Sequence, residues 1–180
     1  MYADWNSIWN FIKVIDYNPI IAWTGLITAI VSIFALSSEN RKWRFSLSID
    51  LLFRLDDKYD TSVMKAFRRN AAKLLLQYQD NNKNKEYRDS LDEVLDFFEM
   101  IGNLVQRRAI NDEMVWHNFS NSIFSYWYFA EKSGYIKEIR EQDKSIWEDI
   151  SYLRKAISKF GDFPPENKLI EFLESEMRLK

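Results

Sequence analysis

A long apolar run near the N-terminus is the first clear pattern in the chain. The residues from Ile20 to Leu36 are almost continuously apolar, and no formally charged residue lies between Asp16 and Glu39. A helix rises about 1.5 Å per residue, so this run is about 30 Å long as a helix, which is the thickness of the hydrocarbon layer of a bilayer. The pattern predicts one transmembrane helix over residues 19–40.

Two other interpretations of the apolar run stay open. It could be a buried core helix of a soluble protein, although globular helices average about 11 to 12 residues and rarely go so long without a charge. It could also be a cleaved signal peptide, because Ala35-Leu36-Ser37 resembles a cleavage site. Against a signal peptide, basic residues follow the run instead of preceding it.

The charges that flank the run predict its orientation. Three cations and a tryptophan follow it, at Arg41, Lys42, Trp43 and Arg44. Because basic flanks stay on the inner side of a membrane, we expect a short extracytoplasmic segment over residues 1–18 and a cytoplasmic domain over 41–180. The predicted location is the cell inner membrane, crossed once with the N-terminus outside. The same four residues are expected at the membrane interface, where cations contact anionic lipid headgroups.

One face of the predicted membrane helix carries only small side chains. At 100° per residue these positions fall on one stripe, and they are Thr24, Gly25, Thr28, Ser32 and Ala35. Small residues let two helices approach closely, and hydroxyl groups can hydrogen-bond between them. The stripe predicts self-association or packing on a partner helix. The alternative is a monomeric anchor with scattered small residues.

Beyond the basic residues the hydrophobic spacing is helical throughout. Apolar positions recur every three or four residues, and the capping residues Thr61 or Ser62 and Asn111 mark two helix starts. We predict an all-α fold in which the transmembrane helix is followed by a bundle of about five to six helices. The expected ranges are 45–58, 61–79, 87–107, 112–132, 135–160 and a short last helix that the run from Asp162 to Pro165 starts and that ends near 179. The first of them could simply continue the membrane helix.

Composition narrows the possible functions. The chain has no cysteine, which excludes disulfides and thiolate chemistry. Residues 45–180 contain 21 Lys and Arg against 24 Asp and Glu. A net negative charge is the wrong sign for binding nucleic acid without a concentrated basic patch. We therefore expect membrane lipids and a protein partner, most simply a second copy of the chain, and no nucleic acid.

Asp143 is the polar residue with the most unusual predicted position. On a helical projection of residues 135–160 it lies in a stripe of isoleucines, about 40° from Ile139. A buried carboxylate needs a cationic or hydrogen-bonding partner. We expect a structural ion pair with Arg68, Arg69 or Arg107, and a local break of the helix at Asp143 is the alternative.

No pattern in the chain predicts catalysis. The run from Asp56 to Asp60 is similar to the aspartate-rich magnesium site of prenyl-transferring enzymes, but a second acidic motif is absent, and a solvated helix end is the simpler interpretation. His117 is the only histidine, and with Glu113 it gives too few ligands for a metal site. We predict no catalytic residue, no metal and no cofactor, and hence that the chain is not an enzyme.

The segments from Val94 to Val105 and from Ile110 to Trp116, followed by Tyr126-Trp127, resemble an uncharacterised bacterial family. Its members are short proteins with one N-terminal membrane helix and a helical cytoplasmic domain. The resemblance covers most of residues 41–157. It implies a structural pair between Glu99 and Arg140, and it implies no assigned activity.

Together these patterns predict a membrane-anchored helical module for interaction or regulation, which could self-associate through its membrane helix. The alternative is a small bacterial effector, in stress or phage defence, that acts on the bilayer. Only the small size and the aromatic-rich N-terminus suggest this alternative.

Overall fold

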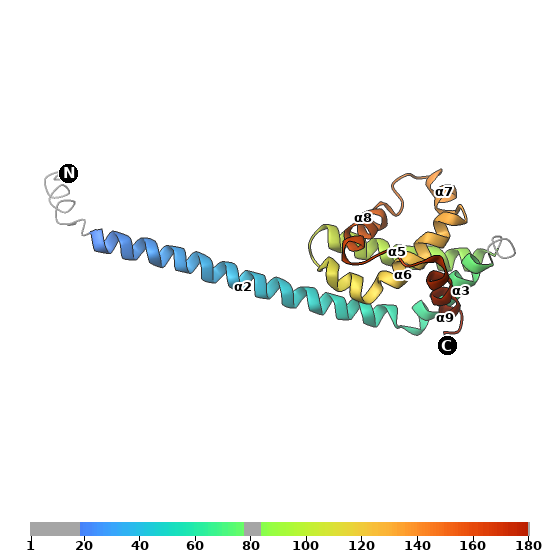
Figure 1. The fold of residues 1–180 in the computed structure, drawn as a ribbon, viewed down its shortest axis with the longest axis horizontal. Helices are drawn as coiled ribbons and strands as arrows, with labels where there is room; N and C mark the ends of the chain where they lie inside the picture. The colour runs from blue at the N-terminus through green and yellow to red at the C-terminus, as the bar shows by residue number, and fades with distance from the viewer. Residues whose placement is uncertain (1–18, 78–83, 180) are drawn as a thin grey trace, which may run out of the picture. The chain divides into compact units, whose positions relative to one another are not determined.

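The protein is helical throughout the part of the chain that the structure describes (Figure 1). This computed structural model describes residues 19–77 and 84–179, without the side chains of 19–24, 26, 40 and 41. The predicted extracytoplasmic segment 1–18 therefore lies outside it. The helices are α2 (Pro19–Tyr59), α3 (Ser62–Leu76), α5 (Lys85–Gln106), α6 (Asp112–Lys132), α7 (Tyr135–Arg140), α8 (Glu148–Ile157) and α9 (Glu166–Glu176).

The all-α part of the prediction is confirmed for these described ranges, which contain no strand. A 3-10 turn, Ser158–Phe160, follows α8. The chain divides into two units, residues 1–44 and residues 45–180, and the boundary falls inside α2. The second unit is a bundle formed by the C-terminal part of α2 and the other helices.

The predicted transmembrane helix is wrong. Among the described residues, no helix has the combination of length and mean hydropathy that crossing a bilayer requires. The predicted helix end near residue 40 is also absent, because α2 continues without interruption to Tyr59. Polar positions such as Thr28 and Ser32 interrupt the described part of the apolar run, and charged positions from Glu39 onward belong to the same helix.

The core of the bundle lies around α5 and α6. α6 packs against α3, α5, α7, α8 and α9. Aromatic rings fill the centre: Tyr59 at the end of α2 stacks on Phe97 of α5 with ring centroids 5.2 Å apart, and meets Phe119 of α6 edge-on at 5.5 Å. Such offset and edge-on pairs add to the free energy gained by burying the rings. The end of α2 is thus part of the core.

Side-chain caps begin the helices where the sequence places capping residues. The Oγ1 of Thr61 accepts a hydrogen bond from the backbone N–H of Met64 at 3.2 Å. Asn111 caps α6 in the same way through the N–H groups of Glu113 and Met114. α6 ends before Gly134, whose φ of 84° is a left-handed conformation that glycine adopts without strain.

The single long helix predicted over residues 135–160 is wrong, because the chain breaks between α7 and α8. Trp147 adopts a left-handed conformation, with φ 58°, and its side chain is buried. The indole Nε1 of Trp147 donates to Asp96 on α5 at 2.8 Å. The break lets Trp147 enter the core while α8 begins in a new direction.

α5 and α8 approach each other closely at one glycine. A Cβ atom added at Gly102 would collide with the backbone carbonyl of Asp149. Only a residue without a side chain fits at this contact, so Gly102 fixes the distance between the two helices. This contact holds the N-terminus of α8 against the middle of α5.

Candidate functional site

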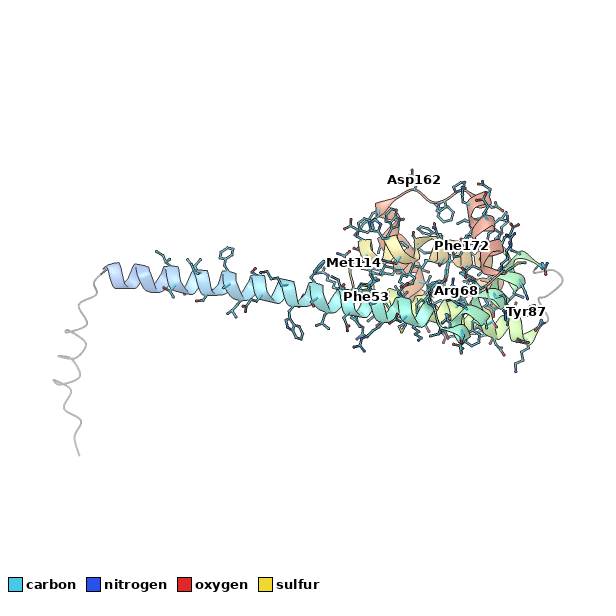
Figure 2. The ribbon with its side chains drawn as sticks, turned by 90° about the horizontal axis from the view of Figure 1, so that it is seen from below. Phe53, Arg68, Tyr87, Met114, Asp162 and Phe172 are labelled. Carbon is cyan, nitrogen blue, oxygen red and sulfur yellow. The ribbon has the colours of Figure 1, made fainter. Side chains whose placement is uncertain are left out.

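An exposed apolar segment of α2, residues 27–36, is the most unusual surface of the protein, and we call it the apolar stretch. Six large aliphatic or aromatic side chains in it are 46 to 73% exposed: Ile27, Ile30, Val31, Ile33, Phe34 and Leu36. The described side chains point to all sides of the helix (Figure 2). Soluble proteins rarely leave so many neighbouring apolar groups in water, and such a surface indicates binding.

The predicted small-residue stripe is exposed as well. A Cβ atom added at Gly25 would meet nothing within 4 Å. The hydroxyl of Ser32 donates to the backbone carbonyl of Thr28 at 2.8 Å, so this donor is used within the helix. Ala35 is exposed, and the side chain of Thr24 lies outside the described part. Packing of this stripe on another helix stays a prediction.

The basic residues that follow the apolar stretch are also in solvent. Lys42 and Arg44 are exposed, and the indole of Trp43 between them is 71% exposed. The side chain of Arg41 lies outside the described part. An apolar surface followed within two turns by cations and an exposed indole is typical of segments that bind at the boundary between lipid headgroups and acyl chains.

Asp143 is not buried, and that prediction is wrong. It lies exposed in the turn between α7 and α8, where the alternative of a local helix break placed it. Its Oδ1 accepts hydrogen bonds from the backbone N–H of Ser145 at 2.9 Å and from its hydroxyl at 2.7 Å. These bonds lower the pKa of Asp143. The carboxylate stabilises a turn and has no ion-pair partner in the described structure.

The buried ion pair of this fold joins Arg68 to Glu176 instead. Arg68 Nε and Nη2 donate to the two carboxylate oxygens of Glu176, each at 2.6 Å. The two residues are only 6% and 4% exposed. Arg68 lies inside the bundle in Figure 2. Paired guanidinium–carboxylate bonds of this kind are strong and directional, so α9 is fixed to α3 at one defined position.

Two tyrosines complete this polar network. Arg68 Nη1 donates to the backbone carbonyl of Tyr59 at 3.1 Å, and its guanidinium lies 3.8 Å from the centre of the Tyr59 ring. The hydroxyl of Tyr126 lies 2.9 Å from the carbonyl of Arg68 and 3.1 Å from Glu176 Oε2. Complete burial raises the pKa of the Tyr126 hydroxyl. The network therefore joins the ends of α2 and α9 to α3 and α6.

The hydrophobic spacing of α3 carries a weak signal for this network. Arg68 follows Met64 by four positions and precedes Ala71 and Leu75 by three and seven, so it lies on the buried face of α3. Nothing local points to Glu176 as its partner. The sequence instead offers Arg68 as one of three possible partners of Asp143.

Glu99 and Arg140, the pair that the family resemblance implied, do not form a direct ion pair. Glu99 accepts the backbone N–H groups of Asp149 at 3.1 Å and Ile150 at 2.8 Å, which caps α8. Arg140 donates to the backbone carbonyls of Ile146 and Trp147 at 3.0 and 2.9 Å. Burial raises the pKa of Glu99, and the nearby guanidinium of Arg140 opposes this rise. The two residues thus hold the same turn from opposite sides.

The described residues contain no cluster of three side chains that could hold a metal ion. The acidic run from Asp56 to Asp60 surrounds the end of α2 and is exposed except for Tyr59. Asp60 forms ion pairs with Lys65 at 3.6 Å and with Arg68 at 3.8 Å. His117 is exposed and lies beside the ring of Trp116. Of the acidic run, Asp60 is thus the carboxylate that contributes ion pairs to the start of α3 in the described structure.

Comparison with protein families gives one match. Residues 19–157 match the family described as a domain of unknown function, DUF4760. The chain belongs to the DUF4760 family. The match covers more than half of the chain, from α2 to α8, and it supports the resemblance to an uncharacterised family. It assigns no enzymatic activity. Comparisons with curated proteins and with solved structures give no match.

The extent of the DUF4760 match leaves part of the buried network outside the family. Arg68, Tyr59 and Tyr126 lie within it, whereas Glu176 and the whole of α9 follow its last residue. In this chain a helix outside the matched region thus supplies the counter-ion of a cation inside it.

Proposed function

We propose that the chain is a helical module held at a lipid surface by the apolar stretch of α2 and by the basic residues that follow it. The single observation that carries the proposal is the exposure of six large apolar side chains within residues 27–36. Burying a large apolar side chain stabilises by roughly 1.5–3 kcal/mol when it is fully removed from water. Even partial burial of six such groups favours association by several kcal/mol.

Charge favours lipid as the occupant of this surface. Lys42 and Arg44 follow the apolar stretch and are exposed, and Trp43 lies between them. Each cation close to an anionic lipid surface contributes about 1 kcal/mol of attraction. A purely apolar partner would leave these cations without a counter-charge, whereas anionic lipid satisfies both parts of the surface.

Flotation of the full-length chain with lipid vesicles tests the proposal. We expect the chain to float with phosphatidylcholine vesicles and more completely with vesicles that also contain phosphatidylglycerol. The variant Ile33→Asn/Phe34→Asn should float at least about tenfold less, because it removes two of the most exposed apolar groups. The control is Val63→Asn/Tyr152→Asn, which changes two exposed apolar residues of the bundle and should float like the unchanged chain.

Coverage of the apolar stretch by a second copy of the chain, instead of by lipid, would give a different flotation result. A chain that stays with the protein fraction in every vesicle mixture, and that light scattering in water finds as a discrete dimer, has its apolar stretch covered by a second copy. That outcome contradicts the lipid proposal. Release of a dye trapped in the same vesicles would support the alternative of an effector that disturbs the bilayer.

A further inference from the structure

The turn between α5 and α6 places an arginine where helices usually end with glycine. The backbone N–H of Arg108 donates to the carbonyl of Val105 at 2.9 Å, and that of Ala109 donates to the carbonyl of Leu104 at 2.8 Å. This pair of bonds is the Schellman arrangement, whose first residue after the cap adopts a left-handed conformation. Arg108 is that residue, with φ 57°. A side chain is strained there, and such strain often accompanies a functional position.

The same turn lies beside the part of α2 that belongs to the bundle unit. The backbone N–H of Asn111, just after the turn, donates to the hydroxyl of Ser48 on α2 at 3.0 Å. The turn that joins α5 to α6 lies beside α2 in Figure 1. Phe45 and Leu47, among the first residues of the bundle unit, are exposed apolar side chains. Exposed apolar residues of α2 and the basic turn therefore belong to neighbouring segments of the bundle unit.

The two arginines of the turn have no counter-charge. Arg107 and Arg108 are both exposed, and neither side chain has an ion pair or a hydrogen bond in the described structure. The nearby carboxylate of Asp112 pairs with Lys159. Every other arginine from residue 45 to residue 157 bonds to a carboxylate or to a backbone carbonyl, namely Arg54, Arg68, Arg69, Arg88, Arg140 and Arg154.

We infer that Arg107 and Arg108 are a second lipid contact, which binds the phosphate groups of anionic phospholipids and sets which end of the bundle faces the lipid surface. The inference rests on the proposed function and adds to it a defined orientation of the bundle. Arginine suits this role because its planar guanidinium binds phosphate oxygens through two parallel hydrogen bonds. The strained backbone at Arg108 keeps two adjacent cations on one exposed turn.

A glycine substitution separates a lipid role from a structural one. Arg108→Gly removes the strain at φ 57° and should raise the melting temperature by about 2–4 °C, the shift that about 1 kcal/mol gives in a domain of this size. The same substitution should weaken binding to vesicles that contain phosphatidylglycerol. A merely structural arginine would show the first effect without the second.

Removal of both arginine charges measures how much they contribute to the binding of anionic vesicles. Arg107→Gln/Arg108→Gln should weaken binding to phosphatidylglycerol vesicles by about tenfold or more, because each cation near the surface contributes about 1 kcal/mol. Binding to pure phosphatidylcholine vesicles should stay unchanged. The matched control, Lys137→Gln/Lys144→Gln, removes two exposed cations of the α7 region and should bind like the unchanged chain on both kinds of vesicle.

The outcomes distinguish this inference from the proposed function. An unchanged chain that binds neither kind of vesicle overturns the proposed function and, with it, this inference. An unchanged chain that prefers phosphatidylglycerol, together with an arginine double variant that keeps the whole of that preference, overturns this inference alone. Equal losses in the arginine and lysine double variants would also overturn it, because they would show a response to net charge and not to one turn.

Discussion

Arg68 and Glu176 are 108 positions apart in the sequence, and two hydrogen bonds of 2.6 Å join them inside the bundle. Both residues are buried. The attraction between buried charges only offsets the cost of removing them from water when their geometry is good. The effect of the pair on the free energy of unfolding should therefore be largest when one partner is removed and the other charge stays buried.

Loss of one partner should be strongly destabilising. Glu176→Gln leaves the buried guanidinium of Arg68 without its buried counter-charge, with only the exposed Asp60 at 3.8 Å, and we expect the free energy of unfolding to fall by about 3–5 kcal/mol. Chemical denaturation followed by circular dichroism measures this change. The control is Glu171→Gln, whose exposed carboxylate pairs with Lys168 and should contribute less than about 1 kcal/mol. Equal effects of the two substitutions would show that the buried pair contributes no more to the free energy of unfolding than the exposed pair.

Removal of both charges should restore part of the stability. In Arg68→Met/Glu176→Leu no charge remains buried, and apolar groups of similar volume often replace a buried ion pair without loss. We expect this double variant to unfold at a higher denaturant concentration than Glu176→Gln. A double variant that is less stable than the single one would mean that the carbonyl of Tyr59, left without its guanidinium donor, dominates the energetics.

Asp92 should make the bundle less stable as the pH rises. Its burial raises the pKa of the carboxyl group above its ordinary value of 3.8, although the hydroxyl of Tyr135 donates to its Oδ1 at 2.7 Å and opposes the rise. An acid with a raised folded pKa stabilises the fold fully below its unfolded pKa, and this contribution is lost as the pH rises through the folded pKa. Asp92→Asn does not titrate, and its amide oxygen can still accept from Tyr135.

The comparison of Asp92→Asn with the unchanged chain tests this dependence. The free energy of unfolding of the variant, relative to the unchanged chain, should increase as the pH rises from about 3.8, the unfolded pKa, to neutrality. The exposed Asp56 gives the control variant Asp56→Asn. A relative stability that falls over the same pH range would show that the carboxylate of Asp92 is stabilised in the folded protein.

Two glycine substitutions should have different effects. Gly102→Ala places a Cβ against the backbone of Asp149, so α5 and α8 must separate, and overpacking of this kind destabilises by about 1–3 kcal/mol. Gly25→Ala meets nothing within 4 Å and should leave the unfolding midpoint of the bundle unchanged. Thermal unfolding by circular dichroism measures both. A tolerated Gly102→Ala would mean that the two helices can slide apart at little cost.

The predicted helix bounds agree best with the structure where capping residues stand at the helix ends. α6 begins and ends at the predicted residues, because Asn111 accepts the first N–H groups and Gly134 supplies the left-handed residue after the end. The predicted helix over 135–160 failed for a physical reason. Ile136 of α7 and Ile150 of α8 are both buried, so the apolar period continues across a break that hydrophobicity alone does not show.

The polar network could be predicted only in part, because its ion pair joins residues that are far apart in the sequence. Arg68 lies on the buried face of α3, and this position is visible in the spacing of Met64 and Leu75. Its partner depends on how α9 packs against the other helices, and no local pattern contains that information. The apolar run was a similar case, since its hydropathy predicted a membrane span that the described helix does not support.

The position of Glu176 also has a consequence for synthesis of the protein. While the ribosome is still adding the residues before α9, Arg68 and the helices around it have already been made, and the guanidinium has only the exposed carboxylate of Asp60 to pair with. The nascent bundle therefore lacks its buried ion pair until translation has produced α9.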